Sequence, residues 1–443
     1  MELKDVILLP LSLMVVIGVG LTIRHLYYRN GEPYARFFMP GLLLKIAGVL
    51  GFCAIYKFYY GGGDTTAYFD FGTILYNRFF EQPNLVWQVW SAAAGTINSK
   101  TIALTNQLPF YAKENTFMVV RITALIGLLS GNSFWATSVY FAAFSFSGAW
   151  AMYRVFTHWY PALYKPLGYA VFALPSVVFW GSGILKDTIA LSSLGWLLWA
   201  LHQLFIQKRH FLLSGCIIWV SVYLISVLKA YILLGFLPAA TFWILGYNLG
   251  SLTDVRLKTF IVILSMVALG AYSYTQSGAL STLVDKFFQQ FVKMAIGFQS
   301  WHSFLAEERG QTGYSLGEVT FTPLGILSKF PAAVNVTLFR PYLFEARNPV
   351  AMITALESAF MLLFTLYVLF VVGLRRFFGY IFGRPEILLC FIFTMIFAFS
   401  VGFSSYNFGA LARYKIPCLP FYAAMLVMIL HCHRLRFSRG VLT

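Results

Sequence analysis

Long apolar runs separated by short polar connections dominate the chain. A helix rises 1.5 Å per residue, so about 20 apolar residues cross the roughly 30 Å hydrocarbon core of a bilayer. The pattern predicts an all-α polytopic membrane protein, with residues 1–443 forming a single transmembrane domain. We expect about 11 spans, at residues 6–23, 39–58, 133–155, 167–181, 188–206, 211–228, 230–249, 259–274, 351–373, 387–403 and 416–430.

One further apolar run, residues 117–129, is short and carries Arg121 near its start. Counting this run as a span would place the basic connections before and after it on opposite faces of the membrane. We therefore expect it to be an interfacial or re-entrant helix.

Lysine and arginine collect in alternate connections that contain almost no Asp or Glu. Short basic loops of this kind are typical of the cytoplasmic face. The N-terminus is then expected outside and the C-terminus in the cytoplasm. The basic residues of these connections are Arg24, Arg29, Arg36, Arg154, Lys165, Lys208, Arg209, Arg256, Lys258, Arg375, Arg376, Arg384, Arg434, Arg436 and Arg439.

Two long polar stretches fall on the outer side, at residues 59–132 and 276–350. Within them, residues 86–90 and 283–298 mix aromatic and polar side chains at helical spacing, which is typical of helices lying in the membrane interface. The sequence thus predicts two large outer loops that carry interfacial helices.

Composition excludes a soluble protein, since 59% of the residues are hydrophobic, 11% are charged and the mean hydropathy is +0.73. A net charge of +16 would indicate nucleic acid in a soluble chain, but here it serves membrane orientation, and we expect no nucleic-acid partner. The five cysteines show no C-x-x-C spacing, so neither a disulfide framework nor a thiolate metal site is indicated.

The stretch YYGGGDTTAYFD, residues 59–70, directly follows a predicted span and places two carboxylates on the outer face. Asp64 is our candidate catalytic residue. The candidate substrate-binding residues share a charged or hydrogen-bonding group near the outer end of a predicted span. They are Asp70, Lys186, Asp187, Arg340, Glu345, Arg347, Glu357, Arg413, Tyr414 and Lys415.

A carboxylate facing several cationic groups suits transfer from a phosphate-linked donor. The carboxylate takes a proton from the attacking hydroxyl, while guanidinium and ammonium groups bind the anion and stabilise the leaving phosphate. Structural roles remain open for the same residues. Asp64 suits a turn or a helix N-cap, Asp187 suits a cap of the helix starting at residue 188, and Lys186 and the arginines suit anchors in the lipid headgroups.

Two ionisable residues lie inside predicted spans, where a charge is costly and is usually functional or paired. Lys45 is expected to extend toward the cytoplasmic end of its span. Glu357 needs a partner from the outer face, for which we expect an arginine of residues 340–347.

Two segments resemble the GT-C superfamily of membrane glycosyltransferases, in particular lipid-linked sugar transferases such as the aminoarabinose transferases and protein mannosyltransferases. The first is GYAVFALPSVVFWGSG with the following ILKD, residues 168–187, and the second is ARYKIPCLPFYAAML, residues 412–426. The acidic residue in the first large outer loop fits the same order of features. A third segment, FRPYLFEARNP at residues 339–349, is similar instead to the outer-loop arginines of O-antigen polymerases.

The resemblance implies a bacterial inner-membrane glycosyltransferase of cell-surface polysaccharide or glycoconjugate synthesis. It would take a polyprenyl-phosphate-linked sugar donor in an outward-facing cavity and transfer the sugar to a glycan acceptor. Asp64 would be the base or would orient the acceptor, and Lys186 and Arg413 would contact the donor phosphate. Mg²⁺ or Mn²⁺ as a cofactor stays open, because two Asp at this spacing are weak metal ligands.

The chain departs from that family by an extra N-terminal span and by lacking a paired Asp-x-Asp. Other functions therefore remain open. They are an O-antigen or exopolysaccharide polymerase, a lipid-linked oligosaccharide transporter or flippase, and a non-catalytic membrane assembly factor.

Overall fold

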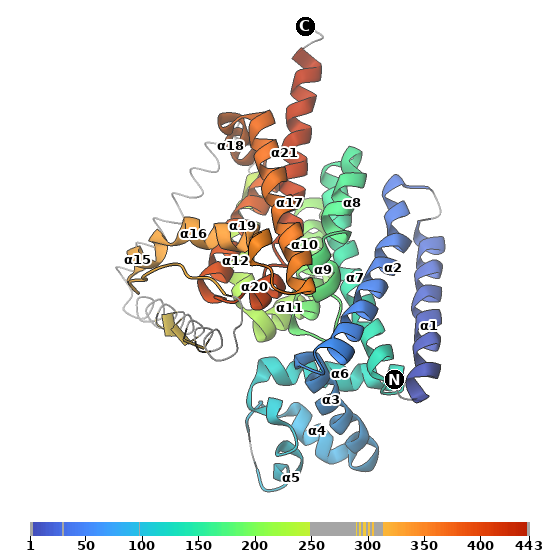
Figure 1. The fold of residues 1–443 in the computed structure, drawn as a ribbon. Coiled ribbons are helices and arrows are strands. Elements are labelled where there is room, and N and C mark those ends of the chain that lie inside the picture. The colour runs from blue at the N-terminus through green and yellow to red at the C-terminus, as the bar shows by residue number, and fades with distance from the viewer. Residues whose placement is uncertain are drawn as a thin grey trace. The chain divides into compact units, whose positions relative to one another are not determined.

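The computed structural model describes residues 3–28, 31–96, 98–248 and 313–440, together with scattered residues between 289 and 304. Within these ranges all regular elements are helical, and the only extended pairing is one bridge between Gly313 and Asn407. The chain divides into two compact units, Met1–Leu233 and Leu234–Thr443. Figure 1 labels the helices of both.

Seven described helices are long and apolar enough to cross a membrane, or up to nine spans if each of two bent pairs is one span. Helices suit lipid because each satisfies its own backbone hydrogen bonds. The prediction of a polytopic α-helical membrane protein is therefore confirmed. The seven are α1 (Leu3–Tyr27), α2 (Phe38–Ala54, with η1 Pro33–Phe37 and η2 Ile55–Tyr59), α10 (Lys186–Leu201, with η5 His202–Gln207), α11 (Phe211–Lys229), α12 (Tyr231–Asn248), α17 (Pro349–Val372) and α19 (Pro385–Ser404).

The bent pairs account for two more of the expected spans. Helix α6 (Glu114–Ser130) turns by 109° into α7 (Phe134–Trp159), and α20 (Phe408–Tyr414) turns by 64° into α21 (Leu419–Gly440). The strong bend agrees with the expectation that residues 117–129 do not form an ordinary span in line with their neighbours. The expected span at residues 259–274 lies outside the described residues.

The expected span at residues 167–181 is instead two short helices, α8 (Tyr164–Phe172) and α9 (Pro175–Trp180). The break precedes Pro175, whose ring disfavours a helical conformation at Leu174. Lys45 of α2 lies at this broken segment, where its Nζ donates to the carbonyl oxygens of Val177 at 2.8 Å and Gly181 at 3.0 Å. Lys45 therefore satisfies carbonyls of the broken helix rather than extending toward the cytoplasmic end of its own.

Helices α7 and α10 form the closest crossing of unit 1 that the structure describes in detail. A Cβ added to Gly148 would lie 2.2 Å from the Ser192 carbonyl oxygen, and one added to Gly195 would lie 2.0 Å from the Gly148 carbonyl oxygen. Small residues allow such close backbone approach in membrane helices. The hydroxyl of Ser192 donates to the Phe144 carbonyl at 2.6 Å across the same interface.

The first expected outer loop folds into α3 (Asp64–Glu81), α4 (Pro83–Ser91), α5 (Ile102–Thr105) and η3 (Pro109–Ala112), followed by α6. Helix α4 buries Val86 and Val89 and leaves Trp87 68% exposed, as expected for an amphipathic helix. Arg121 of α6 is nearly buried, pairs with Glu114 and donates to the Ala92 carbonyl at 2.9 Å. This network ties the chain after α4 to α6.

Unit 2 packs α19 between α16 (Phe330–Phe339) and α21. Its core includes the rings of Phe236, Phe393 and Phe421. The remaining elements of this unit are α15 (Pro323–Ser328), η6 (Leu343–Glu345) and α18 (Leu374–Gly383). The interfacial helix expected at residues 283–298 lies outside the described residues except for a few isolated positions.

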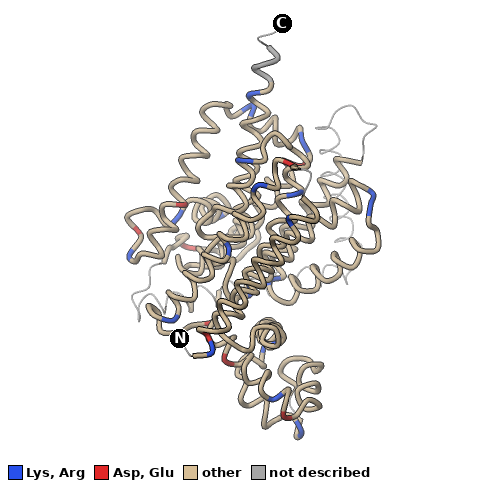
Figure 2. The backbone as a smooth tube through the Cα atoms, turned by 90° about the vertical axis from the view of Figure 1, so that its right-hand side faces the viewer, with Lys and Arg blue, Asp and Glu red and all other residues tan. Residues whose placement is uncertain are grey.

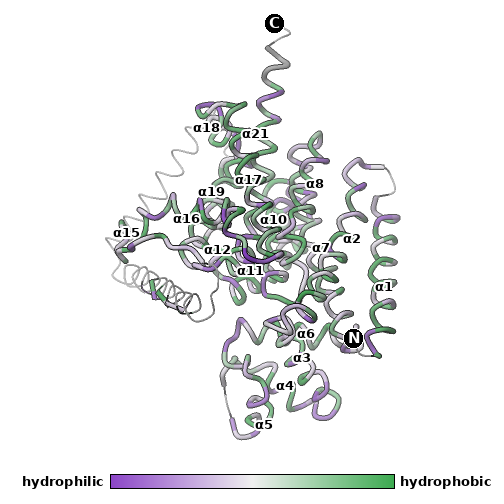
Figure 3. Tube along the Cα trace, viewed as in Figure 1, coloured by the Kyte–Doolittle hydropathy of each residue, from purple (hydrophilic) through white to green (hydrophobic). Residues whose placement is uncertain are grey.

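Charged residues are sparse along the traced chain (Figure 2), and hydrophobic residues predominate along α1 (Figure 3). The acids and bases that do occur in apolar helices therefore stand out as positions that require a partner or a function.

Candidate functional site

The turn before Asp64 is built from three glycines, Gly61, Gly62 and Gly63, whose φ angles of 69°, 137° and 151° favour glycine. A Cβ on Gly63 would also lie 2.8 Å from the ring of Tyr56. The Gly63 N–H donates to Thr66 Oγ1 at 3.0 Å, so this hydroxyl caps the start of α3. One helix thus ends at Tyr59 and the next starts at Asp64, with four residues between them.

Asp64 occupies the first position of α3, and the residue is exposed. The next residue, Thr65, is fully buried, and its hydroxyl has no hydrogen-bond partner within the described residues. Asp64 is therefore a fixed, solvent-facing carboxylate at the end of an apolar helix.

Asp70 lies farther along α3 and lines a small cavity of about 80 Å³. Burial raises the pKa of Asp70, and the positive charge of Lys57 partly offsets this. Asp5, which is 2% exposed, lines the same cavity and accepts a hydrogen bond from Ser133 Oγ at 2.7 Å. The full set of lining residues is Lys4, Asp5, Lys57, Thr66, Phe69, Asp70 and Phe134.

Sequence reasoning missed Lys4, Asp5 and Lys57 in this cavity. Asp5 lies near the start of α1 and Lys57 near the end of the α2 segment, two ends that antiparallel neighbouring helices bring together. The acidic start of the first apolar run was the one available signal, and it suits a helix N-terminus equally well.

Asp187 and Lys186 begin α10. Asp187 is fully buried and forms a hydrogen-bonded ion pair with Lys229, the last residue of α11, which is itself only 7% exposed. Lys186 is half-buried. Within unit 1, Asp187 therefore joins the ends of two apolar helices, whereas Lys186 keeps part of its surface accessible.

In unit 2, Arg340 is held by Glu345 through two hydrogen bonds, from Nε to Oε2 at 3.1 Å and from Nη2 to Oε1. The Tyr342 backbone N–H also donates to Glu345 Oε2, at 2.8 Å. Burial by itself would raise the pKa of Glu345, but the bonds from Arg340 and Tyr342 outweigh it and lower that pKa. The sequence expectation paired Glu357 with an arginine of this segment, but the carboxylate that holds Arg340 here is Glu345.

Three aromatic rings surround the guanidinium group of Arg340. Its central carbon lies 5.7 Å from the ring centroid of Tyr314, 5.6 Å from Tyr342 and 5.1 Å from Phe408. Cation–π contacts of this kind hold an arginine that is already paired with a carboxylate. These contacts and the pair with Glu345 give Arg340 a structural role around η6.

Lys415 is fully buried after α20 and makes hydrogen bonds with two neighbours. Its Nζ donates to Ser358 Oγ at 2.8 Å and to the Arg340 carbonyl at 3.2 Å. The carboxylate of Glu357, 4% exposed, interacts electrostatically with the Lys415 ammonium group. The two hydrogen bonds and the nearby carboxylate together offset part of the cost of burying this lysine.

The remaining candidates of unit 2 are more accessible. Arg347 is exposed, between η6 and the start of α17, and Arg413 and Tyr414 at the end of α20 are half-buried. The structure therefore brings Arg340, Glu345, Glu357 and Lys415 into one network around the Arg340 backbone. Ser358 and Tyr314 belong to the same network and were not expected from the sequence, because neither carries a charge.

Among the described residues, no group of three or more His, Cys, Asp or Glu side chains could hold a metal ion. One or two carboxylates completed by water also hold Mg²⁺ in proteins, so a metal cofactor stays open. The chemistry considered below uses the side chains of the protein.

Taken together, the apolar helices and the charged groups at their ends define a multi-pass α-helical membrane protein. No protein-family model matches the chain, and neither a curated protein nor a solved structure matches it.

Proposed function

We propose that this protein is a membrane glycosyltransferase that moves a sugar or oligosaccharide from a polyprenyl-phosphate-linked donor to an acceptor hydroxyl at the outer face of the membrane. The observation that carries the proposal is the exposed carboxylate of Asp64, fixed at the start of α3 by the triple-glycine turn that follows an apolar helix. A lipid-linked donor presents its phosphate at the membrane surface, and a rigid base at the end of a membrane helix suits such a substrate.

In the proposed reaction, Asp64 accepts the proton of the acceptor hydroxyl. The resulting oxygen nucleophile forms a bond to the anomeric carbon of the donor sugar, while the bond from that carbon to the phosphate oxygen breaks. The polyprenyl phosphate leaves with the electron pair of the broken bond. A positioned general base contributes roughly 10²–10⁴-fold to such a step.

Asp64 suits the base better than Asp70 does. Both residues are exposed, but Asp64 stands at a helix N-terminus, whereas Asp70 lines a cavity of about 80 Å³. Such a cavity is smaller than the roughly 300–1,000 Å³ typical of ligand pockets. We therefore assign Asp70 the role of holding α3 in place, together with Lys57.

The leaving phosphate needs an accessible cation, and Lys186, half-buried at the start of α10 in the same unit as Asp64, is our candidate. In unit 2, Arg340 donates to Glu345, and Lys415 donates to Ser358 and a backbone carbonyl, so these two cations stabilise the fold of that unit.

The test measures sugar transfer by the purified full-length protein. The donors are short-chain polyprenyl monophosphates carrying a hexose or a pentose, and the acceptors are a panel of soluble glycosides. We expect Asp64→Asn to lower kcat by about 10²–10⁴-fold, because asparagine keeps the size of the side chain but cannot accept the proton. The matched control is Glu81→Gln, which changes an exposed acid at the other end of α3.

Lys186→Gln is expected to raise the KM for the donor and leave the KM for the acceptor unchanged. Wild-type turnover by a correctly folded Asp64→Asn variant would remove the base from this mechanism. The wild-type protein is also tested with diphosphate-linked oligosaccharides. If it transfers from these donors and from no monophosphate donor, the result favours the polymerase instead.

A second candidate is a transporter of lipid-linked oligosaccharides. The specific observation in its favour is the buried pair of Asp187 and Lys229, because ionisable groups in membrane helices often mark a transport path. Proteoliposomes separate the two functions. A transporter moves a fluorescent lipid-linked oligosaccharide between leaflets and keeps this activity in the Asp64→Asn variant, whereas a transferase makes product without net translocation.

A further inference from the structure

Helix α18 is short and amphipathic, and it connects two helices that are long and apolar enough to span the membrane, α17 and α19. Phe377 and Ile381 are buried on one side, and Leu374 and Phe378 are exposed beside them. A helix with exposed apolar residues next to buried ones lies naturally at the boundary between headgroups and acyl chains.

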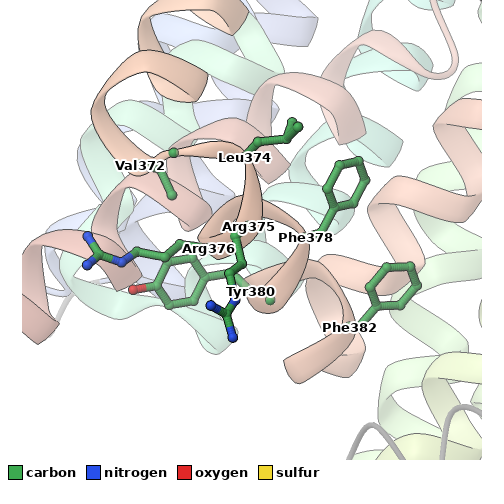
Figure 4. A pocket seen from close by; sticks show the side chains of 9 residues that line it. Val372, Leu374, Arg375, Arg376, Phe378, Tyr380 and Phe382 are labelled. Atoms are coloured by element: carbon green, nitrogen blue, oxygen red, sulfur yellow. The ribbon is translucent and has the colours of Figure 1, made fainter.

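The opposite side of α18 is basic. Arg375 and Arg376 are both exposed, and Tyr380 lies one turn after Arg376, so the two share one face. In Figure 4, both guanidinium groups lie on the Tyr380 side of the helix, away from the rings of Phe378 and Phe382. The helix thus presents cations on one side and apolar rings on the other.

This segment lines a cavity of about 840 Å³. The volume lies within the range of about 300–1,000 Å³ that is typical of small-molecule sites. Its described lining residues are Val372, Gly373, Leu374, Arg375, Arg376, Phe378, Gly379, Tyr380 and Phe382.

Tyr380 has a structural role instead. Its ring packs edge-on against that of His433 in α21, with 6.4 Å between the centroids, and its hydroxyl is buried away from the cavity. The two exposed arginines are therefore the polar side chains of this segment that are accessible to a ligand.

From these observations we infer that the cavity beside α18 binds the headgroup of an anionic phospholipid. The phosphodiester accepts hydrogen bonds from Arg375 and Arg376, and the acyl chains lie along Leu374, Phe378 and Phe382. Arginine matches phosphate oxygens through its planar fork, and the apolar stripe distinguishes a lipid from a free phosphate. The site is separate from the proposed transferase chemistry.

The test titrates the purified full-length protein, in detergent micelles, with dioleoylphosphatidylglycerol or dioleoylphosphatidylcholine and counts bound lipid by native mass spectrometry. We expect the wild-type protein to bind the anionic lipid more tightly. Each lost arginine should weaken binding about fivefold, so Arg375→Gln/Arg376→Gln should weaken it by about 25-fold. Tyr380→Phe should leave binding unchanged, because the hydroxyl that it removes is buried away from the cavity.

The matched control is Arg209→Gln, which removes an exposed positive charge from another basic connection and should leave binding of the anionic lipid unchanged. Size-exclusion profiles and helical circular dichroism verify that the variants are folded. Equal binding of the two lipids, or wild-type binding by the double arginine variant, would overturn the inference. Inorganic phosphate is added at the concentration at which the lipid saturates the site. If it displaces the lipid there, the cavity is a free-phosphate site instead.

Discussion

At the scale of single residues, the chain pairs its buried charges with partners distant in sequence. Lys45 binds the carbonyls of Val177 and Gly181, and Lys229 binds Asp187. Burying an unpaired charge is expensive, and a partner offsets part of this cost. These contacts explain how so apolar a chain tolerates ionisable groups in its helices.

The pair of Asp187 and Lys229 gives a stability prediction. Asp187→Ala or Lys229→Ala should each lower the free energy of unfolding by about 3–5 kcal/mol, because each leaves one buried charge without its partner. The double variant Asp187→Leu/Lys229→Met should be more stable than either single variant. Denaturant unfolding of the purified protein in micelles measures these values.

The exposed pair of Arg78 and Glu81 is the control for that experiment, and its removal should cost no more than about 1 kcal/mol. The double alanine variant tests the coupling of Asp187 and Lys229. If its loss of unfolding free energy equals the sum of the losses in the two single alanine variants, within about 0.5 kcal/mol, the pair is not coupled.

At the scale of elements, the crossing of α7 and α10 depends on the absence of side chains. Gly148 and Gly195 place the two backbones so close that a methyl group at either position would overlap the neighbouring helix. Trp196 Nε1 donates to Ser147 Oγ at 3.0 Å across the same interface. Close contact and interhelical hydrogen bonds are the main source of helix association in lipid.

Gly195→Ala is therefore expected to destabilise unit 1 by about 1–3 kcal/mol, the usual cost of overpacking. The control is Gly215→Ala in α11, where an added Cβ would meet no atom within 4 Å. Because alanine is the better helix former, that control should be neutral or slightly stabilising. Thermal unfolding in micelles measures both variants. If Gly195→Ala and Gly215→Ala melt at the same temperature, the result contradicts the close crossing of α7 and α10.

At the scale of the whole molecule, orientation in the membrane remains a prediction from the basic connections. Only Cys216 of the five cysteines is exposed, so a Cys216→Ser background suits labelling in intact cells. Ser99→Cys should react with a membrane-impermeant maleimide added outside, because residue 99 is exposed in the first expected outer loop. Arg209→Cys should react only after permeabilisation, and the reverse pattern would invert the topology.

Much of the fold follows from the sequence because it depends on local quantities. A run of about 20 apolar residues must form a helix in lipid, which is why α1, α10, α17 and α19 were expected at close to their observed positions. The position of Asp64 followed in the same way, since three glycines cannot continue a helix.

Tertiary structure decided which charges meet. Residue 45 and residues 177 and 181 are separated by 132 and 136 positions, and no local pattern connects them. Packing also assigned Glu345 to Arg340 and brought Asp5 to the cavity of Asp70. Hydropathy and spacing act over one or two turns of a helix, whereas ion pairs, buried hydroxyls and helix crossings depend on which helices become neighbours.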